Sequence, residues 1–124
     1  MFALAAVSVA VVLSRMRPER IVRILNRLNR SCPEASEELC SWVRAAVCNV
    51  SLTCRGPKGC LHRSIATAIG CRLMGASATW CTGFALAPFR AHAWVELEGN
   101  PIDEAEEVAD YVVVLMTSPP RGGE

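Results

Sequence analysis

The sequence predicts an α+β fold in which several helices precede an antiparallel sheet. Apolar residues recur at helical spacing as far as Gly75, and from Ala78 onwards they alternate with a period of two. Turn sequences separate the alternating segments, which is typical of consecutive strands that pair antiparallel. Hydrophobic residues make up 52% and charged residues 20% of the 124 residues, a composition typical of one globular domain. We therefore expect helices packed on an antiparallel sheet.

Two helices are expected within residues 1–30. Residues 2–15 are predicted as an apolar helix, whose apolar stretch of about a dozen residues is shorter than the roughly 20 that a membrane-spanning helix needs. Pro18 stands where the first turn of a second helix tolerates proline. The apolar residues of that helix form a stripe of Ile21, Val22, Ile24, Leu25 and Leu28. Its arginines occupy the other face, which we expect to be solvated.

Two more helices are expected before Gly75. The run Ser31-Cys32-Pro33-Glu34 is typical of a helix start, and this helix should continue to about Val50. Its predicted inward residues are Leu39, Trp42, Val43, Ala46 and Val47. Residues 54–58 are expected to form a loop, and the next helix to begin near Cys60.

Strands are expected from the change of period after Gly75. Residues 78–83 alternate between two faces, and so do residues 91–97. In the second segment, His92, Trp94 and Glu96 share one face. The residues between the two segments, around 87–89, are predicted as a turn.

The remaining residues complete the predicted antiparallel meander. A tight turn at 98–101 should lead into a third short strand that starts at Ile102. An acidic stretch at 104–110 is expected to be helical, and residues 111–116 to form a buried strand.

The chain is expected to have three parts. Residues 1–30 form the N-terminal helices, residues 31–116 the core, and residues 117–124 a disordered tail rich in proline and glycine. The net charge of +1 indicates no particular partner, but arginines crowd the first quarter and acids crowd residues 96–110. A basic surface of this kind suits an acidic peptide, nucleic acid or a membrane surface. We expect neither nucleic acid nor a membrane as the partner.

Cysteine is frequent and odd in number: Cys32, Cys40, Cys48, Cys54, Cys60, Cys71 and Cys81. Full internal pairing is therefore impossible. The apolar start lacks the basic segment and the cleavage site of a secretory signal. We expect a cytoplasmic protein with reduced thiols, most of them acting as small buried apolar residues.

Cys60 is the candidate nucleophile because it stands at a predicted helix start. The positive end of a helix dipole lowers the pKa of a thiol and favours the thiolate, and the preceding Gly59 would let a substrate backbone approach. The alternative is that Cys60 only packs beneath the loop. Cys32 also stands at a predicted helix start, but Pro33 follows it and no histidine motif stands in a suitable relation to it.

His92 is the candidate base, and an acid that follows it would orient its ring. Asp103 and Glu104 point to opposite faces of the expected strand, so only one of them can face His92. Glu96 is excluded because it lies four residues along the strand, roughly 13 Å away. His62 is discounted because it projects about 200° around the helix from Cys60. The alternative for His92 is a purely structural role.

A metal site is the competing interpretation of the same residues. Cys54, Cys60, His62 and His92 could be drawn together around zinc, but the chain has no Cys-x-x-Cys pair and no His pair at zinc-ligand spacing. It also has no phosphate-binding loop and no dinucleotide fingerprint. We expect no metal and no cofactor.

Two motifs together resemble a known family. The first is Cys60-Leu61-x-Arg63-Ser64-x-Ala66, followed by Arg72-x-x-Gly75; the second is Gly83, then Pro88-Phe89-x-Ala91-His92-Ala93-Trp94-Val95-Glu96-x-x-Gly99. They are similar to the transglutaminase-like leader peptidase of lasso-peptide biosynthesis, over about residues 35–116. The separation of cysteine and histidine, 92 − 60 = 32, also matches that family.

This resemblance implies a small papain/transglutaminase-like core with Cys60 as nucleophile and His92 as base. The family's acid falls on Glu104, with Asp103 as the reserve. The implied activity is a cysteine protease that removes the leader from a ribosomally synthesised precursor peptide. An ATP-dependent, asparagine-synthetase-like cyclase then closes the macrolactam. Because some members carry a fused leader-recognition domain, we expect a separate leader-recognition protein here.

Two other functions stay open at this point. One is a non-catalytic peptide-binding scaffold subunit that has kept the fold. The other is a transglutaminase or amidase that acts on another substrate.

Overall fold

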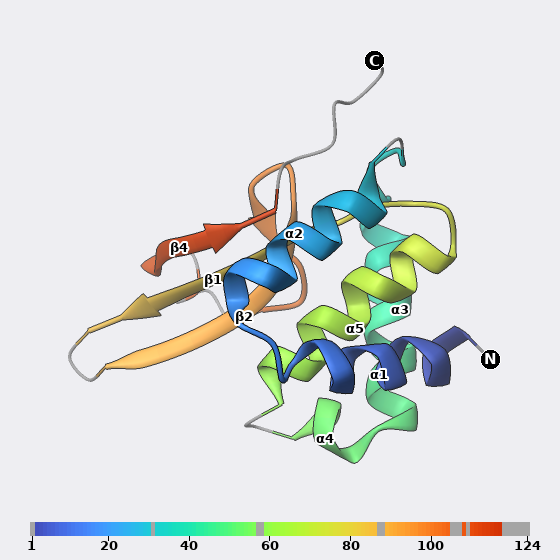
Figure 1. Ribbon diagram of the computed structural model, residues 1–124, viewed down its shortest axis with the longest axis horizontal. Helices are drawn as coiled ribbons and strands as arrows, with labels where there is room; N and C mark the ends of the chain where they lie inside the picture. The colour runs from blue at the N-terminus through green and yellow to red at the C-terminus, as the bar shows by residue number, and fades with distance from the viewer. Residues whose placement is uncertain are drawn as a thin grey trace.

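A computed structural model describes residues 2–30, 32–56, 59–86, 89–104, 108 and 110–117 (Figure 1). Its helices are α1 (Phe2–Leu13), α2 (Pro18–Asn29), α3 (Glu37–Val50), α4 (Leu52–Arg55) and α5 (Cys60–Leu73). Its strands are β1 (Thr79–Ala85), β2 (Arg90–Leu97), β3 (Asn100–Pro101) and β4 (Val112–Met116). The α+β fold with helices first is therefore confirmed.

The predicted features at Ser31, 57–58, 87–88, 105–107, 109 and 118–124 lie wholly or partly outside the described residues. They include part of the predicted loop before Cys60, most of the turn between the first two strands, and most of the acidic stretch. The predicted disordered tail lies outside them too, except for Thr117.

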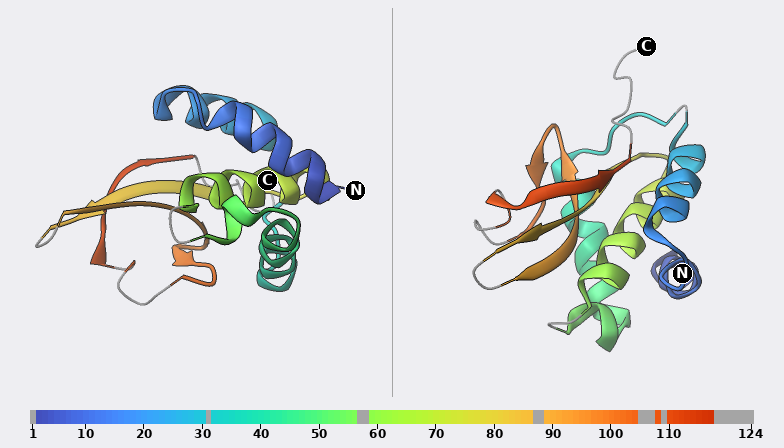
Figure 2. Two further views of the ribbon diagram at one scale, coloured as in Figure 1. Left: turned by 90° about the horizontal axis from the view of Figure 1, so that it is seen from below. Right: turned by 60° about the vertical axis from the view of Figure 1, so that its left-hand side comes forward.

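Helix α5 is the centre of the helical layer. It contacts α1, α3 and α4, and its other side packs on β2. Figure 2 shows α1 and α2 on one side of α5 and α3 on the other. Every residue of the segment 64–71 is buried, so the middle of α5 is enclosed on all sides.

The N-terminal helices belong to the same core as the rest of the chain. Small side chains let α1 lie close to α5, and the buried residues of α1 are Ala3, Ala6, Ala10 and Leu13. Helix α2 begins at Pro18, as predicted, and buries Ile21 and Leu25 of its apolar stripe. None of the helices in the described part of the chain is long and apolar enough to cross a membrane.

The predicted start of the third helix is wrong. Helix α3 begins at Glu37, because the Ser36 hydroxyl accepts a hydrogen bond from the Leu39 amide at 3.1 Å and caps it. The residues before it are extended instead: the Ser77 amide donates to the Pro33 carbonyl, and the Ala35 amide donates to the Ser77 carbonyl, both at 2.8 Å. These backbone groups thus satisfy one another outside a helix.

Two further predictions about this region are also wrong. Trp42 was expected inward, but it is 53% exposed and stacks on Phe2 with ring centroids 5.2 Å apart. The inward face of α3 carries Cys40, Val43 and Val47. The expected loop at 54–58 begins within α4, which the Ser51 hydroxyl caps by accepting from the Cys54 amide.

The sheet is antiparallel with strand order β3-β2-β1-β4, so it is not a simple meander. The last strand crosses back and pairs with β1 at the edge. This is why the prediction of a buried strand at 111–116 is wrong: Val112, Val113 and Val114 are exposed. Strand β3 also precedes Ile102 instead of starting there.

The described structure continues to Thr117, which is fully buried although it was predicted to open the disordered tail. Its hydroxyl accepts a hydrogen bond from the Trp80 amide at 2.9 Å, and its own amide donates to the Trp80 carbonyl at 2.9 Å. Thr117 therefore continues the hydrogen bonding with β1 beyond the end of β4.

We predict that Thr117→Val lowers the free energy of unfolding by about 1–3 kcal/mol, because it leaves the buried Trp80 amide without an acceptor. Chemical denaturation would measure the change. The matched control is Thr53→Val, at an exposed threonine, which should change stability by less than about 0.5 kcal/mol. Equal stability of the two variants would contradict the prediction.

Candidate active site

Cys60 is the first residue of α5, and its side chain is half-buried. Gly59 before it packs tightly on α4: a Cβ atom there would lie 1.8 Å from the Thr53 carbonyl oxygen. Gly59 was expected to let a substrate backbone approach, and in the structure it also lets the start of α5 contact α4. Only glycine allows this approach, so it fixes the position of the thiol.

His92 lies on β2 opposite Gly83 of β1. A Cβ at Gly83 would lie 2.5 Å from the Val112 carbonyl oxygen and 3.0 Å from the Trp94 ring, so this strand position is also restricted to glycine. The imidazole is 19% exposed and forms hydrogen bonds with the Cys60 thiol and with Glu104. The structure thus brings together the cysteine and the histidine that the sequence singled out.

Glu104 holds the far side of the imidazole. Its Oε1 lies 2.6 Å from His92 Nε2, and its Oε2 lies 3.4 Å from a guanidinium nitrogen of Arg44 on α3. The carboxylate side chain is only 8% exposed, so water screens these contacts weakly. Both oxygens of Glu104 are therefore engaged by cationic or polar partners.

Asp103, the reserve acid, is exposed and forms no hydrogen bond with His92. Its φ angle of 53° places it in a left-handed turn. The expectation that Asp103 and Glu104 lie on opposite faces of a strand is wrong, since β3 ends at Pro101 before either residue.

The thiol and the imidazole have shifted pKa values. Burial raises the pKa of Cys60, but hydrogen bonds with His92 and with the backbone of Ala93, together with the charges of His92 and Arg63, outweigh burial and leave that pKa below its ordinary value. Hydrogen bonds with Cys60 and Glu104 raise the pKa of His92 to about 9, although burial opposes them. Both shifts are in the direction that favours a thiolate beside an imidazolium.

Aromatic rings form one wall of the site. Trp94 stacks on His92 with centroids 5.9 Å apart, and Tyr111 meets both rings edge-on at 6.0 Å. Arg90 lies 5.8 Å from the centre of the Tyr111 ring. Glu96 accepts a hydrogen bond from the Trp94 indole at 3.1 Å, so it serves this wall and not the imidazole.

The other candidates lie elsewhere. His62 contacts the Ser14 hydroxyl at 3.1 Å, and Cys32 precedes the start of α3 by several residues. Cys54 is buried, and burial raises its pKa. Within the described ranges, no three His, Cys, Asp or Glu side chains gather in a way that could hold a metal ion. All seven cysteines are free thiols.

Sequence reasoning missed Arg44, Arg63 and Tyr111. Arg63 donates to the Cys54 carbonyl at 2.8 Å and so ties α5 to the segment before it. The presence of Arg63 in the Cys60 motif indicated that this residue is important, but it did not indicate which group the residue contacts. Arg44 and Tyr111 come from distant parts of the chain, and no local pattern indicates that they meet at Glu104 and His92.

This arrangement is that of papain-like thiol enzymes: a thiol stands at a helix start, an imidazole on the adjoining strand, and a carboxylate follows. The chain belongs to the transglutaminase-like superfamily, whose family model matches residues 3–117. Neither a curated protein nor a solved structure matches the chain. The predicted transglutaminase-like fold is therefore confirmed, while removal of a lasso-peptide leader stays a prediction.

We predict that iodoacetamide at neutral pH modifies Cys60 faster than Cys32, a thiol that is also half-buried. The reagent attacks the thiolate, and His92 holds the pKa of Cys60 down. In His92→Ala, burial still raises the pKa of Cys60 but the imidazole no longer lowers it. Cys60 should therefore react about tenfold more slowly for each unit by which its pKa rises. Peptide mass mapping gives both rates in one sample. An unchanged Cys60 rate in His92→Ala would contradict the assigned contact.

Proposed function

We propose that this protein is a cysteine peptidase that removes the leader from a ribosomally synthesised lasso-peptide precursor. The observation that carries the proposal is the contact of Cys60 with His92, whose other side is held by Glu104. Membership of the transglutaminase-like superfamily supports thiol chemistry at this site. The choice of a leader as substrate rests on the resemblance carried by the segment from Pro88 to Glu96.

Acylation would begin with attack of the Cys60 thiolate on the carbonyl carbon at the end of the leader. A sulfur–carbon bond forms, and the carbonyl oxygen takes the negative charge. The first amide groups of a helix have no acceptor within that helix, so those at the start of α5 are suited to donate to this oxygen. Each such donor is typically worth about 3 kcal/mol in the transition state.

The His92 imidazolium would then protonate the leaving amine, which becomes the N-terminus of the freed core peptide. The carbon–nitrogen bond breaks and the leader remains as a thioester on Cys60. His92, now neutral, takes a proton from water while the hydroxide adds to the thioester. Breakage of the sulfur–carbon bond releases the leader as an acid and restores the thiolate and the imidazolium.

Glu104 and Arg44 would act through the imidazole. Glu104 occupies Nε2, which leaves Nδ1 to exchange protons with the substrate and water. Arg44 fixes the second carboxylate oxygen and so restrains the rotation of Glu104. Arg44 is thus a positioning residue in this proposal.

The proposed partners follow from the proposed substrate. They are the precursor peptide, a separate leader-recognition protein and the ATP-dependent, asparagine-synthetase-like cyclase that uses the freed amine. We propose that these steps take place in the cytoplasm, where the seven free thiols would stay reduced.

We predict that Cys60→Ala abolishes cleavage of a precursor encoded beside this gene, in a reaction that includes the neighbouring recognition protein. The loss should exceed a thousandfold, because the nucleophile itself is removed. Mass spectrometry of the peptide products measures it. Cys48→Ala is the matched control, since Cys48 is half-buried and lies outside the site; it should retain activity.

The products also separate the alternative functions. Reaction in ¹⁸O-labelled water places the label on the leader carboxylate if the enzyme is a peptidase. A leader joined to an added amine would indicate a transferase instead. Full cleavage by Cys60→Ala would rule out this site as the source of the activity, and binding without cleavage by the unaltered chain would favour a scaffold.

A further inference from the structure

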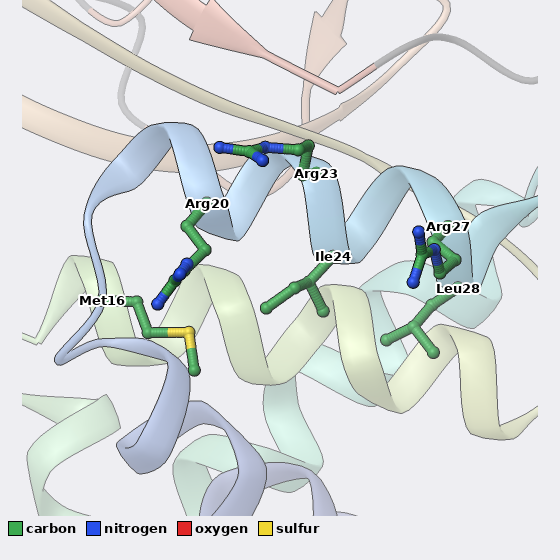
Figure 3. Close-up of a pocket in the computed structure, with 6 residues that line it drawn as sticks. All are labelled: Met16, Arg20, Arg23, Ile24, Arg27 and Leu28. Atoms are coloured by element: carbon green, nitrogen blue, oxygen red, sulfur yellow. The ribbon is translucent and has the colours of Figure 1, made fainter.

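A groove runs along the exposed side of α2 and the turn before it (Figure 3). Its cavity has a volume of about 480 Å³ and is lined by Met16, Arg20, Arg23, Ile24, Arg27 and Leu28. A second hollow of about 540 Å³ shares Met16, Arg20 and Arg23 with it and continues past Arg15 and Arg17. We call this continuous surface the α2 groove.

The α2 groove is strongly basic. Five arginines line it (Arg15, Arg17, Arg20, Arg23 and Arg27), and the single acid among its lining residues is Glu19. In the part of the chain that the structure describes, the ion pairs are those of Glu104 with Arg44 and His92. None of the five arginines forms an ion pair with a described acid, and their excess over Glu19 favours an anionic occupant.

The α2 groove is also apolar between its charges. Arg20, Ile24 and Leu28 follow one another at a spacing of four residues and project from the same side of α2 in Figure 3, with Met16 below the first turn. Ile24 and Leu28 give an occupant apolar surface to cover, and the arginine forks match carboxylates in geometry. An occupant must therefore carry acidic and apolar side chains together.

These properties select one class of partner. A nucleic acid would satisfy the arginines but supplies no aliphatic side chains for Ile24 and Leu28. A membrane surface would supply both chemistries, but it is flat and this surface is hollow. We propose that the α2 groove binds an acidic, apolar peptide segment of another chain.

One end of the groove lies near the start of α5. Met16 at its end lies two residues after Ser14, whose hydroxyl is 3.1 Å from His62 Nε2. His62 is in the first turn of α5, which begins at Cys60. A peptide held in the groove would thus have one end near the start of α5, on the side of that helix that carries His62 and away from the Cys60 thiol. The binding therefore does not rest on the proposed function.

The test measures binding in a Cys60→Ala background, so that no cleavage is needed. The probes are two pools of short fluorescein-labelled peptides. One pool alternates Asp or Glu with Leu, Ile, Val or Phe, and the other has Lys in place of the acids.

Fluorescence anisotropy compares the binding of these pools to the parent and to the double variant Arg20→Glu/Arg27→Glu, which alters the groove. Its matched control is Arg30→Glu/Arg55→Glu, which makes the same change of net charge at exposed arginines outside the lining.

The proposal expects the acidic pool to bind and its affinity to fall as salt is raised. The groove variant should bind it at least tenfold more weakly and should prefer the lysine pool, while the control variant stays within about twofold of the parent. Circular dichroism checks that all variants remain folded.

Equal affinity of the two double variants, or equal binding of both pools to the parent, would overturn the proposal. So would binding of phosphatidylglycerol vesicles or of single-stranded RNA in the absence of peptide binding, because the occupant would then belong to another class. If the acidic pool binds to the groove but the unaltered protein does not cleave the precursor, the proposed peptide binding stands and the proposed peptidase function fails.

Discussion

The burial of the middle of α5 on all sides is the constraint on which the site depends. Helix α1 and helix α3 cover it, and the sheet covers it through β2, so its first residue has one position relative to the strand that carries His92. Gly59 and Gly70 permit this close packing: a Cβ at Gly70 would lie 2.5 Å from a methyl group of Val43, and a Cβ at Gly59 would collide with Thr53. Core packing therefore determines where the thiol lies, before any polar contact is made.

The polar contacts then determine what the thiol does. Burial alone raises the pKa of a thiol, and the hydrogen bonds with His92 and Ala93 reverse that effect at Cys60. His92 in turn keeps its proton because Cys60 and Glu104 both favour the cation. Three groups from α5, β2 and the segment after β3 thus depend on one another, and the weakly screened carboxylate of Glu104 completes the set.

The features that could be predicted from the sequence are those that depend on local patterns. Alternation located β2 and the face of His92, and the helical pattern that follows the predicted loop placed the start of α5 near Cys60. The choice between Asp103 and Glu104 was open, because it depends on a left-handed turn at Asp103 and on Arg44, sixty residues from Glu104 in the chain. Trp42 was placed wrongly because a helical stripe does not tell whether a large ring packs inward or stacks on another helix, as it does on Phe2. Likewise, the β-branched residues 112–114 predict a strand but not its position at an exposed edge.

NMR titration of the His92 ring tests most directly whether Cys60 and Glu104 together stabilise the imidazolium. The chain has two histidines, so histidine-labelled protein gives two signals, and a His62→Gln variant assigns them. We expect a pKa of about 9 for His92 and a lower value in Cys60→Ala, because that variant lacks the thiol that stabilises the cation. A His92 pKa near the ordinary 6.5 in both proteins would contradict it.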